Sequence, residues 1–132
     1  MMTPGSVTEL KALLIGMKPA LCERIWAFHA LSEKGLIPDT AFAVIREDEG
    51  LCAILPAPAA PADASQFARI TLQVHSDLEA VGLTAAVATA LATSGIACNV
   101  IAGLRHDHLF VPWDRREEAL KLLEKLSLDA RR

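Results

Sequence analysis

Apolar residues near the start of the chain follow a helical period, three and four residues apart. The positions of this stripe are Leu10, Leu13, Leu14 and Met17. They predict a helix within residues 3–20, which cannot run past Pro19 because the residue before a proline disfavours helical backbone. Ser6 followed by Glu9 has the spacing of a capping box at the start of that helix.

The pattern then changes to the short apolar runs of β-strands. Aromatic and β-branched residues predict a strand over residues 24–31. Two further runs, 41–45 and 51–55, flank an acidic stretch that ends in Gly50, and they predict a β-hairpin because glycine adopts the positive φ of such turns.

Residues 56–64, with the sequence PAPAAPADA, interrupt the apolar pattern. Three prolines among alanines favour an extended connector. We therefore predict two units, residues 1–63 with a helix and three strands, and residues 64–132.

The second unit begins with strict alternation over residues 68–75, which predicts a strand with one buried face. An alanine-rich helix follows, with Leu83, Val87 and Leu91 on one side, and Gly95 ends it. Strands are predicted over residues 96–102 and 109–111.

A last helix is predicted from Asp114, with Glu117 completing a capping box and apolar residues at helical spacing behind it. The order strand, helix, strand, strand, helix predicts an α+β fold, the ferredoxin-like βαββαβ sandwich without its last strand. We expect this fourth strand to come from the N-terminal unit or from another copy, because an open apolar sheet edge favours aggregation.

Composition narrows the classes of function. The chain has 132 residues, of which 52% are hydrophobic, and a net charge of −3. It lacks the basic stripe that nucleic-acid binding requires. It also lacks a signal peptide and an apolar run long enough for a bilayer, so we predict a cytoplasmic protein without nucleic-acid or membrane partners.

The run VHSDLEAVGLTAAVATALATSGIACNVIAGLRHDHLFVP resembles an ACT domain, particularly the aspartokinase-type regulatory modules. The whole chain is similar to small stand-alone bacterial proteins that contain two tandem ACT-like units, the first of them reduced. The match is strong over residues 68–126 and looser over residues 7–67.

The resemblance implies regulatory binding of an amino acid where two ACT-like units sit side by side. The ligand then lies between the loop after the first strand and the second strand of a neighbouring unit. Carried onto this chain, the loop positions are Val81, Gly82, Leu83 and Thr84, and the strand positions are Cys98, Asn99 and Ile101. Several aspartokinase-type modules have an Asp that holds the ammonium group where this chain has Asn99.

The residues support such a site independently. A helix that begins near Leu83 presents unpaired N–H groups and partial positive charge, and Gly82 leaves room for a carboxylate to approach. His106, close to the end of the second strand, is a further candidate for the pocket. The alternative interpretation stays open: Gly82 is a turn glycine, Asn99 satisfies backbone groups, and Ser76 caps a short turn before the helix.

Catalysis and metal binding have less support. The sequence has no paired nucleophile and base, no P-loop and no dinucleotide fingerprint, and it implies no cofactor. His106 and His108, two residues apart on an extended segment, could share a metal with His75 or Asp107, but a polar hairpin explains them more simply. Three hypotheses follow: a non-enzymatic sensor of an amino acid or related carboxylate acting as a homodimer, a structural dimerisation module, and a metal-binding protein.

Overall fold

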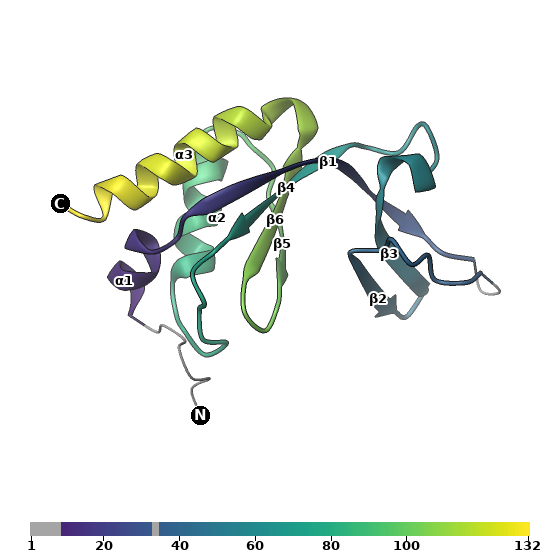
Figure 1. Ribbon diagram of the computed structural model, residues 1–132, viewed down its shortest axis with the longest axis horizontal. Coiled ribbons are helices and arrows are strands. Elements are labelled where there is room, and N and C mark those ends of the chain that lie inside the picture. Colours follow the sequence, from purple (N-terminus) through teal and green to yellow (C-terminus); the bar gives the residue numbers. More distant parts are fainter. Residues whose placement is uncertain (1–8, 33–34) are drawn as a thin grey trace. The chain divides into compact units, whose positions relative to one another are not determined.

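The computed structural model describes residues 9–32 and 35–132, and contacts group the chain into two compact units (Figure 1). Unit 1 contains the N-terminal segment up to Cys22 together with Ala68–Arg132, and unit 2 contains Glu23–Phe67. The predicted division of the sequence into residues 1–63 and 64–132 refers to the two ACT-like units, not to these compact units, and it stays a prediction.

Unit 1 is an α+β sandwich in which helices cover one face of a sheet. Its helices are α1 (Leu10–Ile15), α2 (Leu83–Thr93) and α3 (Arg116–Asp129), with the 3-10 helix η2 (Trp113–Arg115) before α3. Its sheet contains the beginning of β1 (Pro19–Ala30), then β4 (Phe67–Leu72), β6 (Asp107–Pro112) and β5 (Asn99–Ala102), in that order. The predicted ferredoxin-like fold is confirmed.

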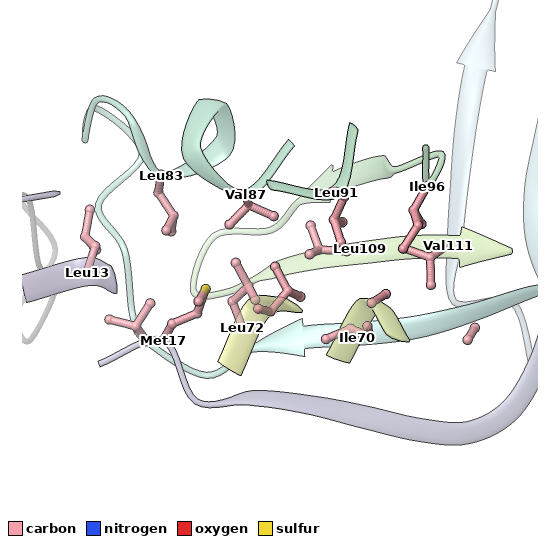
Figure 2. Close-up of a cluster of buried hydrophobic side chains, with 14 residues drawn as sticks. Leu13, Met17, Ile70, Leu72, Leu83, Val87, Leu91, Ile96, Leu109 and Val111 are labelled. Atoms are coloured by element: carbon pink, nitrogen blue, oxygen red, sulfur yellow. The ribbon is translucent and has the colours of Figure 1, made fainter. Parts of the chain in front are cut away.

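The core of unit 1 lies between the helices and the sheet (Figure 2). Every element contributes to it, including Leu13 from α1, Val87 and Leu91 from α2, and Leu123 from α3, all fully buried. The stripe predicted for α2 is therefore the face that packs. Gly95 ends this helix at φ 71°, where its N–H donates to the carbonyl of Ala92 at 2.9 Å.

The N-terminal segment supplies the fourth strand of unit 1. In the sheet order, β1 is the neighbour of β4 on the side away from β6. Gln73 joins the two segments, because its N–H donates to the carbonyl of Met17 and its side-chain amide to the carbonyl of Lys18, both at 2.8 Å. The chain itself thus completes the βαββ unit.

The structure corrects several predicted helix ends. α1 spans only Leu10–Ile15 and is capped by Glu9, whose carboxylate accepts hydrogen bonds from the N–H groups of Lys11 and Ala12. Met17 is buried in the core but lies after the helix, and the predicted cap Ser6 lies outside the described residues. The capping box at the last helix is wrong: η2 comes first, and no side chain caps α3 at Arg115.

Unit 2 contains the predicted hairpin. Strands β2 (Ala43–Glu47) and β3 (Gly50–Pro56) pair antiparallel, with Glu47 opposite Gly50, and the second part of β1 pairs with β3 on its other side. Gly50 has φ 132°, the positive φ that the sequence predicted for this turn. Two edge-to-face aromatic pairs, Trp26 with Phe42 and Phe28 with Phe67, pack within this unit.

Candidate ligand-binding site

The segment after β4 folds back on itself before α2 begins. The carboxylate of Asp77 accepts a hydrogen bond from the N–H of Glu79 at 2.9 Å, and the carbonyl of Asp77 accepts one from the N–H of Ala80 at 3.0 Å. Asp77 is only 6% exposed. The predicted turn before the helix is present, and Asp77, not Ser76, closes it.

Helix α2 begins at an uncapped glycine. Gly82 is the N-cap, with φ 106° and ψ −21°, and it has no side chain that could cap the first turn. Its carbonyl accepts the first helical hydrogen bond, from the N–H of Ala86 at 2.9 Å. The first N–H groups of a helix have no partner within it, so this end carries partial positive charge.

A small cavity of about 160 Å³ lies at this end of α2, entirely within unit 1. Gly82, Leu83 and Thr84 line it from the helix, and Ser76 and Asp77 line it from the turn. The opposite wall includes Ala102 and Gly103 at the end of β5 and Asp107 at the start of β6. The cavity thus joins segments that are about twenty residues apart in the sequence.

Asp107, on this wall of the cavity, is half-buried. Burial raises its pKa, while a hydrogen bond with Ser76 and the charge of His106 partly offset that rise. Burial therefore disfavours the ionised form of Asp107, and a neighbouring positive charge favours it.

Of the four predicted loop positions, three line the cavity. Val81 does not, and its side chain is 81% exposed. The side chain of Leu83 is only 4% exposed and belongs to the core, so its backbone is what it can offer a ligand. A Cβ at Gly82 would lie 3.1 Å from Cδ2 of Leu10. The space beside this glycine thus holds a side chain of α1, which the sequence did not indicate.

The predicted positions at the second strand lie away from this cavity. Asn99 is paired with Phe110, and its side-chain amide donates to the carbonyl of Phe110 at 3.5 Å. Strand alternation places Ile101 on the same face of β5 as Asn99, opposite to Val100, which packs on the core. Cys98 also packs against the core, where burial raises the pKa of its thiol.

The histidines at this end of the sheet make different contacts. The ring centroids of His75 and His106 are 6.4 Å apart, whereas Nδ1 of His108 forms a hydrogen bond with Oγ1 of Thr71 at 2.9 Å. Burial lowers the pKa of His108, and the charges of Arg69 and His106 lower it further. Within residues 9–32 and 35–132, no group of three or more His, Cys, Asp or Glu side chains is arranged to hold a metal ion.

Sequence reasoning missed the acidic wall of the cavity. The sequence indicates Asp107 only as a possible partner for a metal ion and gives no signal for Asp77. A signal for Asp107 existed in the hairpin register, because Ala102 and Asp107 are paired across β5 and β6. That pairing brings a carboxylate to the carboxyl end of the second strand, beside the predicted loop.

Comparisons with known proteins fit this fold. Two family models match, both describing an ACT domain, one over residues 65–125 and the other over residues 5–70. The chain belongs to the ACT-domain family. Two ACT matches in tandem confirm the predicted resemblance, and ACT domains are regulatory modules that bind small molecules.

Solved structures with the same fold include a Vibrio cholerae protein of unknown function, described as a possible transport protein. It is 41% identical, with a TM-score of 0.73, and the match covers 86% of this ACT protein and 92% of that chain. An Agrobacterium tumefaciens protein is 22% identical, with a TM-score of 0.69 and coverage of 84% and 89%.

The ligand-free regulatory subunit of aspartate kinase from Thermus thermophilus is 11% identical, with a TM-score of 0.61 and coverage of 84% of this ACT protein and 97% of that chain. At this identity the likeness shows the fold alone. No curated protein matches the sequence. None of the helices in the described part of the chain is long and apolar enough to cross a membrane.

Proposed function

We propose that this ACT protein is a non-enzymatic cytoplasmic sensor that binds an amino acid or a related small carboxylate in the cavity at the start of α2. The observation that carries the proposal is that the uncapped helix end opens on this cavity. A carboxylate can accept hydrogen bonds from the first N–H groups of a helix, which have no partner within the helix, and it gains from the helix dipole.

The size of the cavity limits the ligand. Pockets for drug-sized molecules measure roughly 300–1,000 Å³, whereas this cavity measures about 160 Å³. A nucleotide or an extended cofactor is too large to be enclosed, so the ligand must be a small metabolite.

A thermal-shift panel of the twenty amino acids tests the proposal. A ligand at 100-fold its Kd should add about 2.7 kcal/mol to the free energy of unfolding, which raises Tm by several degrees. The matched variants are Thr84→Asp and Thr89→Asp, two exposed positions on the same helix. Asp in the first turn favours the helix but repels a bound carboxylate, so Thr84→Asp should abolish the shift and Thr89→Asp should keep it.

The absence of a shift with every amino acid at millimolar concentration would exclude a sensor of free amino acids. Equal loss in both threonine variants would place the ligand elsewhere than at the first turn of α2.

We further propose that two copies associate through β5. This strand is at the edge of the unit 1 sheet, and edge strands carry unpaired N–H and C=O groups that a second chain can bind. Such a dimer would bring Asn99 and Ile101 of one copy toward the loop of the other, as the ACT resemblance implies.

Sedimentation equilibrium should therefore show a homodimer. Ile101→Lys places a charge on the edge strand and should weaken the dimer by at least tenfold, whereas Val44→Lys, on strand β2 of unit 2, should leave it unchanged. A monomeric wild-type protein would refute the assembly. A dimer without any ligand shift would instead favour the structural dimerisation module.

A further inference from the structure

A histidine lies between two central strands on the face of the unit 1 sheet opposite the helices. Ile70 and Leu72 of β4 and Leu109 of β6 belong to the core, so strand alternation places Thr71 and His108 on the opposite face. Nδ1 of His108 and Oγ1 of Thr71 form a hydrogen bond of 2.9 Å. Because β4 and β6 are neighbours in the sheet, this bond connects the two strands through their side chains.

The charges that act on the half-buried ring of His108 are positive. They belong to Arg69, from β4, and to His106, from the turn before β6. The residue paired with His108 on β5 is Ile101, which is apolar. Asp107 is the adjacent acid, but alternation places it on the helix side of β6, where it lines the cavity at the start of α2. These surroundings favour the neutral ring of His108.

Protonation changes the hydrogen bonds that the His108 ring can form. A neutral imidazole has one donor and one acceptor nitrogen, whereas an imidazolium donates from both. Nδ1 must then donate to Thr71, and Nε2 gains an N–H beside the backbone of the β5–β6 turn, where a Cβ at Gly103 would lie 3.7 Å from that nitrogen. Burial lowers the pKa of His108, and the charges of Arg69 and His106 lower it further.

We propose that His108 is a proton switch in unit 1. As a neutral ring it connects β6 to β4, and its protonation in mildly acidic solution weakens this connection and destabilises the unit. Protonation of His75 and His106, whose ring centroids are 6.4 Å apart at the same end of the sheet, would add further positive charge. The switch needs no ligand, so it does not depend on what the cavity at the start of α2 binds.

Proton linkage gives the direction of the effect. The pKa of His108 is lowered in the folded protein from the ordinary value of 6.5. Between these two values the unfolded chain binds more protons than the folded protein, so acid favours unfolding. The contribution of His108 to stability is therefore complete above pH 6.5, falls as the pH drops through 6.5, and is lost below the pKa of the folded protein.

NMR titration of the histidine rings in the wild-type protein tests the first step. The ring C–H signals of His108, assigned by their loss in His108→Asn, should titrate with a midpoint below pH 6.5. Arg69→Gln removes one of the two cations and should raise this midpoint. Arg46→Gln, which changes an exposed arginine on β2 of unit 2, is the matched control and should leave the midpoint where it is.

Urea denaturation at about pH 8 and about pH 5 tests the consequence for stability. Circular dichroism of the helices reports on unit 1, because α1, α2 and α3 all belong to it. Between the two pH values, the equilibrium constant for unfolding should rise at least about threefold more in the wild-type protein than in His108→Asn, which offers Thr71 a polar side chain that does not titrate. His29→Asn changes a half-buried histidine of unit 2 and should keep the wild-type dependence on pH.

Two results would overturn the switch. One is a His108 midpoint at or above pH 6.5 in the wild-type protein, and the other is an equal dependence of stability on pH in the wild-type protein and His108→Asn. If His108→Asn does not fold, the wild-type midpoint and its rise in Arg69→Gln decide the question.

Discussion

Replacing Leu13 by alanine should lower the free energy of unfolding by about 2–5 kcal/mol, the cost of removing a large side chain from a close-packed core. Leu13 is fully buried in the unit 1 core, among side chains of residues more than fifty positions later in the sequence. Urea denaturation followed by circular dichroism measures the loss. Lys11→Ala, on the exposed side of the same short helix, should change stability by less than about 0.5 kcal/mol.

The same variant tests whether the N-terminal segment completes the unit 1 sheet. α1 is also attached to α3, where the hydroxyl of Ser127 donates to the carbonyl of Ile15 at 3.2 Å. Loosening α1 should release the start of β1, and the N–H of Gln73, which donates to Met17, should then exchange faster with solvent. A stability loss below about 1 kcal/mol, with unchanged exchange at Gln73, would show that the segment is not part of this core.

The elements that depend on local sequence were predicted well. The stripe of Leu83, Val87 and Leu91 and the glycine that ends α2 need only the helical period and the freedom of glycine at positive φ. The hairpin of β2 and β3 is equally local, since its turn and its two apolar runs are contiguous in the sequence.

The elements that depend on distant pairing could not be placed. Nothing in the alternation of residues 24–31 says that β1 begins at Pro19 or that β4 is its neighbour. Met17 fits the helical stripe, yet α1 ends at Ile15, and the residue is buried by tertiary packing after the helix. The expected capping box at Asp114 failed because η2 occupies the turn before α3.

The candidate site divides in the same way. The resemblance to ACT domains implied the loop positions, and the glycine before an alanine-rich helix is a local signal that supports them. Gly82, Leu83 and Thr84 line the cavity and Val81 does not, and their role in ligand binding stays a prediction. Asp107 could not be selected from spacing alone, because its approach depends on the register that sets it opposite Ala102. The burial of Cys98 likewise depends on which face of β5 meets the core.

Gly82→Val should both destabilise the protein and abolish any stabilisation by an amino acid. At φ 106° a branched L residue is strained, which costs about 1–2 kcal/mol, and its Cβ would meet Cδ2 of Leu10 at 3.1 Å, which adds about 1–3 kcal/mol. The combined loss of about 2–5 kcal/mol is measurable by urea denaturation. The new side chain would also stand at the helix end that the ligand must approach.

Gly95→Val is the matched control, because Gly95 also has positive φ but nothing lies within 4 Å of a Cβ there. Its free energy of unfolding should fall by only about 1–2 kcal/mol, because it has the backbone strain without the close contact. It should also keep the rise in Tm produced by the ligand. Adding Leu10→Ala to Gly82→Val should recover part of the stability by removing the close neighbour. Equal destabilisation of the two glycine variants, with no recovery in the double variant, would mean that Leu10 does not pack on Gly82. In that case only the positive φ would require glycine at position 82, and the space beside it would be open to a ligand.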